Sequence, residues 1–559
     1  MASFEKGVQL EKAIIHYRPS RCRQNSLDYS SWTFPSLAAL KELPFSNSSD
    51  NDAHVSPPKR YKCLLRKLRY TLFNVYRRIF SVIFLANITG AVLVLREPID
   101  SISLSNLATW SSTNFLVAIL IRQDFAINLL FRSAWLVPWS VPLRLRHMVA
   151  RVYSYGGIHS GAAVAGTMWF LVFTALLTTR FLDAGLYTLP VVVVTWAIVM
   201  LLTILLLLAM PQVRFAHHDA FELSHRFLGW ASIALFWVQL VLLTKHEAQL
   251  SSSPTSSSSS SISSFPTLLV RQPTFLNLVA ITILLVYPWL RLRKWTFHAE
   301  KLSSHAVRLH FTHPVHRFSC LSVSDAPWRE WHPFATFPDT GEEEEEVCED
   351  GKQDGAAAGA RTRRRGASII VSAAGDWTKA LIRSVPDRKT CSCATTTSPT
   401  TFPHHLPTIS LYTRGHPRAG VLSLTTLFPR IVLFTTGSGI GPSLSSLLDR
   451  PPGQSARLIW STRAPRETFG AAIMRDVRAV DPGAIILDTS SSATAPLAPS
   501  SFFSPATLSP TQLIRLCETV AAEVGAEAVF VLSNKALTRR LVSGLEQRRV
   551  RAYGPIWDS

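Results

Sequence analysis

The first half of the chain is dominated by long apolar runs. A membrane-spanning helix needs about 20 mostly apolar residues. The segments that fit this pattern are Ile79–Leu95, Asn114–Trp139, Gly156–Thr178, Thr188–Met210, Leu223–Leu243 and Phe275–Leu290. The second is interrupted by Arg122, Asp124 and Arg132. The pattern predicts a bundle of about six transmembrane helices over residues 59–294, preceded by a polar segment at 1–58.

Basic residues lie on one side of the predicted helices. They precede the first helix and follow the second, fourth and sixth: Lys59, Arg60, Arg77, Arg78, Arg144, Arg146, Arg151, Arg214, Arg226, Arg291, Arg293 and Lys294. The Ser-rich tract Ser251–Ser264 lies in a loop on the opposite side. Cytoplasmic loops carry the excess of Lys and Arg. We therefore expect a multi-pass integral membrane protein with both termini in the cytoplasm and no cleaved signal peptide.

Composition supports this interpretation. The mean hydropathy is +0.18 and only 17% of residues are charged. The formal net charge of +20 would suit nucleic acid, but the cations flank apolar runs, so membrane lipid is the expected partner and nucleic acid is not. The 7 cysteines show neither a disulfide framework nor a zinc-binding spacing.

Residues 295–559 have short apolar runs separated by turns, which predicts a folded domain rich in strands. Two polar insertions, at about 341–366 and 391–405, predict disordered surface loops. The strongest motif follows the apolar run Ile431–Thr436, where Gly437, Gly439 and Gly441 precede a helical pattern. Glycines at a strand-to-helix turn let the backbone approach a pyrophosphate at the helix N-terminus. A purely structural tight turn is the alternative.

Further strands and motifs surround this turn. The apolar runs Arg457–Thr462, Ala484–Leu487 and Ala528–Leu532 predict more strands of the same α/β domain. Upstream, His-Pro-Phe-x-Thr begins at His332, and Gly-x-x-Thr begins at Gly375. Each upstream motif is common when taken alone, and their order gives them weight.

The order of these features resembles the ferric reductase / NADPH oxidase superfamily. Details that bring the chain closest to fungal ferric-reductase-like membrane proteins of the TmpA type are Ile119–Arg122 with Asn128, Gly156–Gly161, His225–Trp230, Gly420–Leu422 and Gly554–Ser559. The resemblance implies a helical membrane bundle followed by a cytoplasmic ferredoxin–NADP reductase-like module. A β-barrel that binds FAD would cover residues 295–425, and an α/β domain that binds NAD(P) would cover 426–559.

The resemblance also implies cofactor contacts for matching residues. Those assigned to the flavin and ribityl chain of FAD are His332, Pro333, Phe334 and Thr336. Gly375 and Thr378 would face the FAD pyrophosphate, and Trp557 would stack on the flavin or pack on the surface.

The nicotinamide dinucleotide would bind next to the glycine turn. Gly437, Gly439 and Gly441 would hold its phosphates. Ser461 and Arg463 follow the next strand, where Arg463 suits a 2′-phosphate because a guanidinium binds phosphate bidentately. NADPH is thus slightly favoured over NADH. The alternative is that Arg463 is a solvent-exposed charge in a loop and contacts no cofactor.

The superfamily's haem pattern is incomplete. Its members hold two stacked haems, and here His159 and His225 are candidate ligands of an inner haem. The positions expected to bind an outer haem carry Val172 or Phe173, and Val238 or Gln239. A two-haem relay is therefore not expected, and one haem or none remains open.

These observations predict a membrane-bound FAD-dependent NAD(P)H oxidoreductase. Its electron acceptor would be membrane-associated, for example a small metabolite. The resemblance implies the plasma membrane as the location, since most members of the family are found there. One alternative is a ferric or metal reductase with one inner haem. The other is a non-catalytic membrane sensor or scaffold with a degenerate flavoprotein domain. The last alternative is supported by Val531–Asn534, which stands where relatives carry a Cys-Gly pair, and by the missing outer-haem histidines. The glycine turn and the His-Pro-Phe-x-Thr motif oppose it. No catalytic residue is predicted.

Overall fold

The computed structural model describes residues 74–251, 265–339, 366–387, 406–490, 502–503 and 508–555. All of them belong to one compact unit, residues 56–559. The polar segment 1–58, the insertion 391–405, nearly all of 341–366 and Trp557 lie outside the described residues.

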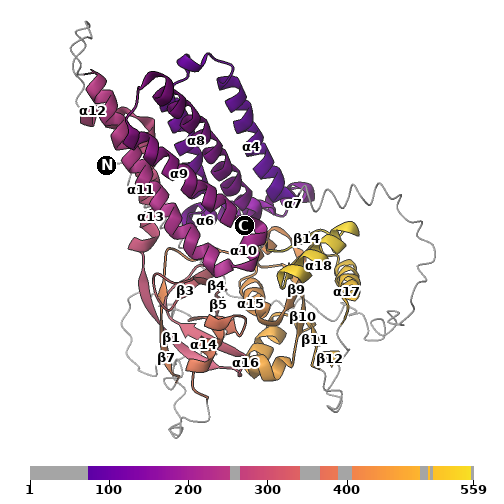
Figure 1. The fold of residues 1–559 in the computed structure, drawn as a ribbon. Helices are drawn as coiled ribbons and strands as arrows, with labels where there is room; N and C mark the ends of the chain where they lie inside the picture. Colours follow the sequence, from indigo (N-terminus) through magenta and orange to yellow (C-terminus); the bar gives the residue numbers. More distant parts are fainter. Residues whose placement is uncertain are drawn as a thin grey trace, which may run out of the picture. The chain divides into compact units, whose positions relative to one another are not determined.

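Long helices form the first half of the described chain (Figure 1). They are α4 (Val75–Val94), α5 (Leu104–Leu120), α6 (Asp124–Trp135), α8 (Gly156–Ala184), α9 (Leu189–Leu208), α11 (His218–Ser251) and α13 (Pro273–Leu290). By length and composition, 5 helical segments could cross a membrane, or up to 6 if α5 and α6 count as one bent span. Short helices α7 (Leu143–Val149), α10 (Pro211–Ala216) and α12 (Phe265–Arg271) connect them.

The second predicted helix is two helices, which corrects the expected continuous segment Asn114–Trp139. α5 and α6 are bent by 64° at the polar residues between them. The Asp124 carboxylate, at the start of α6, accepts hydrogen bonds from the His416 backbone N–H and the Arg418 side chain. α6 therefore packs beside β8 (Arg418–Ala419) and the 3₁₀ segment Val421–Leu427.

Close packing of α4 on α8 depends on glycines. A Cβ at Gly157 would lie closer than 3.0 Å to the backbone oxygen of Tyr76, and one at Gly161 would lie 3.2 Å from the backbone oxygen of Phe80. Small residues four apart let two helices approach at this distance. The glycines of the 156–161 motif thus form a helix–helix contact.

Replacing Gly157 should weaken this contact. We expect Gly157→Ala to lower the unfolding free energy by about 1–3 kcal/mol, since a methyl group forced into a packed interface displaces backbone. The matched control is Gly229→Ala, because a Cβ at Gly229 meets no atom within 4 Å. Thermal unfolding in mild detergent measures both, and equal midpoints for the two variants would contradict this packing.

Two sheets follow the bundle. An antiparallel 8-stranded sheet has the order β4-β3-β7-β1-β2-β6-β5, with β8 on β3. Its strands are β1 (Arg293–Lys301), β2 (Ala306–Phe311), β3 (Ser319–Ser324), β4 (His332–Ala335), β5 (Phe337–Pro338), β6 (Ala367–Ser372), β7 (Thr408–Thr413) and β8. Helix α14 (Asp376–Ser384) follows β6. The antiparallel sheet lies where the sequence predicts a domain rich in strands, and the assignment of residues 295–425 as an FAD-binding β-barrel stays a prediction.

The second sheet is parallel and 6-stranded, with the order β12-β11-β10-β9-β13-β14. Its elements are β9 (Arg430–Thr436), α15 (Ile440–Leu448), β10 (Ser455–Thr462), α16 (Pro465–Val480), β11 (Ile485–Asp488), β12 (Phe502–Phe503), α17 (Pro510–Glu523), β13 (Ala528–Leu532), α18 (Lys535–Gln547) and β14 (Ala552–Tyr553). This is the α/β domain that the glycine motif predicts.

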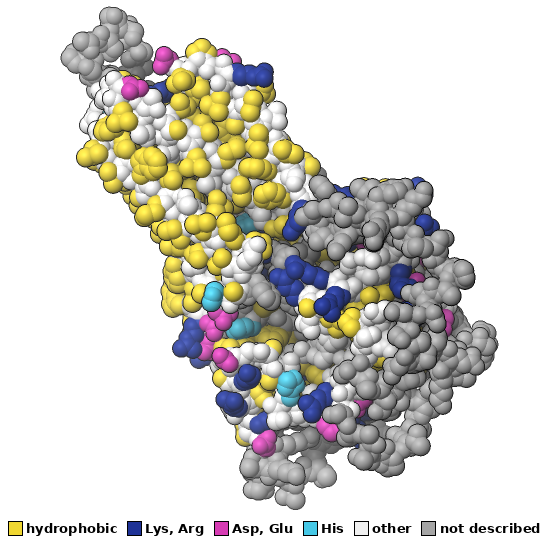
Figure 2. All heavy atoms as spheres, turned by 45° about the vertical axis from the view of Figure 1, so that its right-hand side comes forward, with side chains coloured by type: hydrophobic (Ala, Val, Ile, Leu, Met, Phe, Trp, Pro, Cys, Tyr) yellow, Lys and Arg dark blue, Asp and Glu magenta, His cyan; other side chains and the backbone are white. Residues whose placement is uncertain are grey.

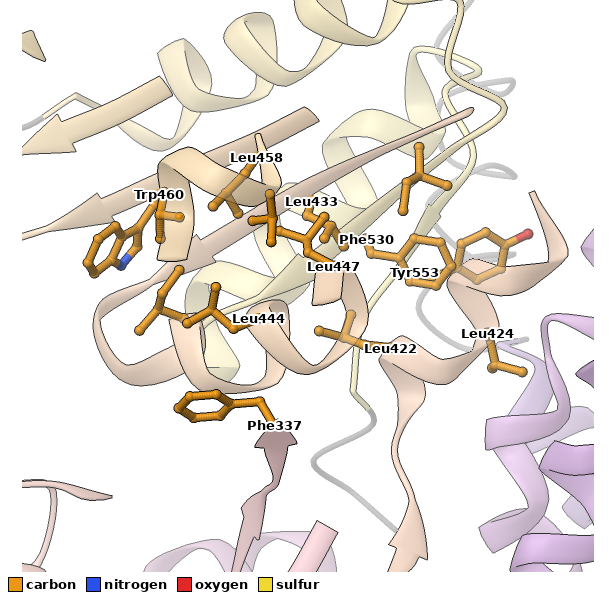
Figure 3. Packing of buried hydrophobic residues seen from close by; sticks show 14 of the residues in the cluster. Phe337, Leu422, Leu424, Leu433, Leu444, Leu447, Leu458, Trp460, Phe530 and Tyr553 are labelled. Carbon is orange, nitrogen blue, oxygen red and sulfur yellow. The ribbon is translucent and has the colours of Figure 1, made fainter. Parts of the chain in front are cut away.

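One apolar core joins the parallel sheet to its neighbours. Figure 3 shows Leu433, Leu458 and Phe530 of the central strands facing Leu444 and Leu447 of α15. Phe337 of β5 reaches the other side of α15 and is 1% exposed. Helix α15 is therefore held between the parallel sheet and the antiparallel sheet.

A buried charged network crosses the same boundary. Arg308 of β2 donates from Nη2 to Asp339 Oδ1 at 2.9 Å and lies 3.7 Å, through Nη1, from Asp476 of α16. His310 lies within 3.2 Å of Asp339 through Nδ1 and 3.3 Å from Glu300 through Nε2. The network thus links the antiparallel sheet to a helix of the α/β domain.

This network should make stability depend on pH. Burial lowers the pKa of His310, but hydrogen bonds to Asp339 and Glu300 outweigh it, so the pKa is raised above 6.5. The stabilisation by protonated His310 is complete below pH 6.5 and is lost as pH rises through the raised pKa. We expect His310→Gln to flatten this alkaline decline in the unfolding midpoint. An unchanged profile in His310→Gln would contradict the assignment.

Candidate functional site

The His-Pro-Phe-x-Thr motif forms the edge strand β4 of the antiparallel sheet. The His332 ring stacks on the Trp377 ring with centroids 4.2 Å apart, and Phe334 lies 6.3 Å from Trp377. Pro333, between them in sequence, is exposed. Because Trp377 is in the first turn of α14, the structure brings the His332 motif and the Gly375 motif together.

The two threonines of these motifs have their hydroxyl groups engaged within the protein. Thr336 Oγ1 lies 2.7 Å from Ser319 Oγ and 3.1 Å from the Ser319 backbone oxygen. Thr378 Oγ1 accepts from the backbone N–H groups of Ala374 and Gly375 and donates to the Gly375 oxygen. Both threonines therefore shape the backbone of their motifs. A Cβ at Gly375 would meet no atom within 4 Å, so the space above the start of α14 is open.

Burial sets the protonation of the candidate flavin-side histidine. His332 Nε2 is buried without a hydrogen-bond partner among the described residues. Burial lowers the pKa of His332 below 6.5, and nearby carboxylates oppose this shift. The lowered pKa favours the neutral ring, and Nε2 has no hydrogen-bond partner in the part of the chain that the structure describes.

Each of the three glycines in the turn after β9 has a different local role. Gly437 has φ 51°, a region that glycine adopts freely, and a Cβ there would meet open space. A Cβ at Gly439 would lie closer than 3.0 Å to Thr435 Oγ1, so only glycine fits. Gly441 faces Ile370 at an ordinary 3.7 Å. The buried Trp460 donates from Nε1 to the Gly437 oxygen at 3.0 Å and fixes the turn.

Polar groups gather where the central parallel strands end. Ser461 of β10 is the register partner of Thr436 of β9, so it lies beside the glycine turn. Thr436 Oγ1 lies 2.7 Å from Ser533 Oγ, just after β13. Arg463 is exposed two residues beyond Ser461. The carboxyl ends of parallel strands at a switch in strand order form the usual dinucleotide crevice. Sequence reasoning noted Ser533 only as a departure from a pattern.

The glycine turn and the His332 strand share one boundary. Helix α15 contacts β4 and β5, and the turn Gly437–Gly439 contacts β6. The predicted flavin and nucleotide residues therefore come from facing edges of the two sheets.

The two candidate haem ligands lie close together near one end of the bundle. The His159 and His225 rings are 6.3 Å apart between centroids and meet edge to face. His159 Nδ1 lies 2.8 Å from the Ala118 backbone oxygen, and His225 Nδ1 is buried without a hydrogen-bond partner in the described chain. No group of three or more potential metal-ligating side chains occurs among the described residues. The haem assignment stays a prediction.

A connection between α6 and the antiparallel sheet was not foreseen. Asn128 donates to the Pro417 oxygen and accepts from the Ala419 N–H at 2.8 Å, one turn after Asp124 binds Arg418. Nearby, the Arg414 guanidinium lies 4.8 Å from the Trp289 ring centre and 4.7 Å from that of Trp331. The sequence signal was available, since Asp124 and Asn128 are polar residues four apart within an apolar stretch.

The sequence is similar to one protein family and to two fungal reductases. Residues 421–501 and 505–559 match the family described as adenylate-forming reductase 03009, C-terminal domain. Adenylate-forming reductase 03009 of Coprinopsis cinerea is 33% identical over 528 residues, 93% of this chain and 43% of the relative. Adenylate-forming reductase 06235 of the same fungus is 33% identical over 509 residues, 90% of this chain and 42% of the relative. The chain thus spans less than half the length of these relatives.

Solved structures give weaker matches. A flavohemoglobin from Malassezia yamatoensis with bound FAD and heme has a TM-score of 0.30 at 11% identity, covering 80% of this chain and 98% of that one. Ferredoxin-NADP+ reductase from Plasmodium falciparum with 2'P-AMP has a TM-score of 0.27 at 9% identity, covering 47% and 95%. The assignment of two domains rests on the sheets described above.

The relatives correct the expected family. The resemblance to the ferric reductase / NADPH oxidase superfamily, and to its TmpA-type members, is wrong, because the matching family and both curated relatives are adenylate-forming reductases. The ferric reductase alternative is dropped with it.

Proposed function

We propose that this chain is a membrane-embedded oxidoreductase that takes electrons from cytoplasmic NAD(P)H through FAD to a membrane-associated acceptor. The observation that carries the proposal is the meeting of the glycine turn and the His332 strand at one boundary. The names of both curated relatives describe reductases, which supports this reaction class.

The residues fit the cofactors. Gly437 leaves open space at a strand end, and the backbone N–H groups that begin α15 can hold phosphate. His332, Phe334 and Trp377 offer aromatic faces, with the unpartnered His332 Nε2 among them. FAD, when bound, would accept a hydride and release electrons singly. The protein's residues would position the two cofactors and exclude water.

Membrane embedding rests on the surface of the bundle. Figure 2 shows apolar side chains covering its visible face, while charged side chains gather over the two-sheet part. Exposed residues include Val193 at 56%, Trp196 at 51% and Ile283 at 60%. Such a continuous apolar surface suits lipid. The plasma membrane and cytoplasmic termini remain part of the proposal.

The proposal is tested by absorption spectroscopy of the full chain purified in mild detergent. Flavin bands that bleach on addition of NADPH are the expected result. A non-catalytic sensor or scaffold is the second candidate, since the hydroxyl groups of Thr336 and Thr378 are already engaged. A spectrum without flavin bands, from protein supplied with FAD, would favour that candidate and overturn the redox proposal.

Arg463 should decide between the two nicotinamide cofactors. If it binds the 2′-phosphate, Arg463→Ser removes a charge-assisted hydrogen bond worth ~1.5–3 kcal/mol, so KM for NADPH should rise about 10-fold or more. KM for NADH should not change. Arg478→Ser is the control, because Arg478 is likewise exposed but lies near the far end of α16. Steady-state kinetics with both cofactors measure the effect, and parallel changes in both KM values would rule out this role.

A further inference from the structure

The helical bundle contains a cavity of about 50 Å³ among α5, α8, α11 and α13. One water molecule needs roughly 10–15 Å³, so the cavity has room for several water-sized groups. Phe115, Phe170, Phe173 and Phe236 line it. Phe170 and Phe173 are 2% and 1% exposed, so these walls are fixed within the bundle core.

The cavity is a shaft with its mouth at one end of the bundle. Ser105 begins α5, Tyr187 follows α8, Glu247 is near the end of α11 and Gln272 precedes α13, and all four line the cavity. These helix ends lie at the end of the bundle away from the two sheets (Figure 1). Ser105 and Phe115 are separated by about 15 Å along α5, at ~1.5 Å per residue. The lining of the shaft therefore extends over about 15 Å along α5.

Gln239 places one free acceptor in this shaft. It is 4% exposed and lines the cavity. Its Nε2 donates to Thr195 Oγ1 at 2.6 Å, and Thr195 donates its own hydrogen to the Val191 oxygen at 2.7 Å. Thr195 must therefore accept, which fixes the amide orientation. Gln239 Oε1 has no hydrogen-bond donor among the described residues.

Ser111, Ser112 and Glu247 of the lining already have hydrogen-bond partners within the protein. Ser111 donates to the Gly166 oxygen at 2.9 Å, and Ser112 donates to the Thr109 oxygen and accepts from Asn277. Glu247 accepts from Gln272 at 3.0 Å near the mouth. Gln239 Oε1 accepts no hydrogen bond from a described residue and is not one of the fully buried side-chain atoms, so it keeps accessible surface in a side chain that lines the cavity. It is therefore open to a hydrogen-bond donor of a ligand.

We propose that this shaft binds a small, neutral, slender amphiphile whose hydroxyl group donates to Gln239 Oε1 while its apolar body lies against the four phenylalanines. A charged ligand does not fit, because the walls around Gln239 carry no cation and the only carboxylate of the lining is near the mouth. The site is distinct from the flavin and nucleotide residues and does not depend on the redox proposal.

Photolabelling of the full chain in nanodiscs tests this proposal. The probe is the short photoreactive alcohol 2-(3-methyldiazirin-3-yl)ethanol, with butan-1-ol as competitor. Saturable, competed labelling of peptides containing Phe170, Phe173 or Gln239 is expected. Phe173→Trp should lower it about 10-fold by filling the shaft. Leu171→Trp, on the exposed side of the same helix, is the matched control and should leave it unchanged.

A second pair of variants separates binding from folding. Gln239→Leu removes the acceptor while Thr195 keeps its bond to Val191, so labelling should fall about 5-fold, the size of one neutral hydrogen bond. Phe173→Leu widens the shaft and should keep or raise labelling. Labelling that does not saturate, or that is the same in Phe173→Trp and Gln239→Leu as in the unmodified protein, would overturn the proposal.

Discussion

Gly439→Ala should lower NAD(P)H-dependent flavin reduction about 100-fold, because a misplacement of about 1 Å at a reacting centre costs this much in rate. The added methyl group would lie closer than 3.0 Å to Thr435 Oγ1 and 3.2 Å from the Leu532 oxygen. The turn is expected to move away from β9 and β13, and the phosphates of a dinucleotide bound there would move with it. Flavin content should be retained, since the candidate FAD residues belong to the other sheet. Stopped-flow flavin reduction measures the rate.

The same turn supplies the control. A Cβ at Gly441 meets Ile370 at an ordinary 3.7 Å, so Gly441→Ala should keep most of the rate. Thr435→Ala in the Gly439→Ala background removes the clashing oxygen and should restore part of the rate. If Gly439→Ala reduced flavin as fast as Gly441→Ala, the dinucleotide would have to bind elsewhere.

The sequence predicted those elements whose apolar pattern is local. The strand Ala528–Leu532 is found with the predicted bounds. β1 was missed although Trp295, Phe297 and Ala299 alternate with polar residues, because its first cations were assigned to the flank of the last helix. The inward residues of that alternation form part of the core of the antiparallel sheet.

Those parts of the candidate site were predictable whose contacts join residues that are close in the sequence. The glycine turn follows from its own sequence, since strand, turn and helix are consecutive. The use of the Thr336 hydroxyl was not predictable, because its partner Ser319 is on a neighbouring strand. The polar residues before α6 are visible in the sequence and indicate a bend there. The ion pair that Asp124 forms was not predictable, because its partner Arg418 is far away in the sequence.

Arg308→Met should destabilise the protein by about 3–5 kcal/mol, the cost of leaving a buried carboxylate without its partner. The side chains of Arg308 and Asp339 are 6% and 17% exposed, and Arg308 Nε also donates to Ser368 at 2.9 Å. Its guanidinium lies 5.0 Å from the Phe337 ring centre, so the change also disturbs the core that holds α15. The apparent unfolding temperature in detergent and the retention of flavin should both fall.

Two further variants test whether the lost charge of Arg308 causes the destabilisation in Arg308→Met. The Arg329–Asp325 pair is exposed, at 66% and 41%, so Arg329→Met should cost less than about 1 kcal/mol. Adding Asp339→Asn to Arg308→Met removes the uncompensated carboxylate and should recover part of the loss. His310 then loses one of the two carboxylates that raise its pKa and keeps Glu300, so the double variant should show a smaller alkaline decline in stability. A double variant less stable than Arg308→Met would mean that packing of the arginine side chain, and not its charge, joins the two sheets.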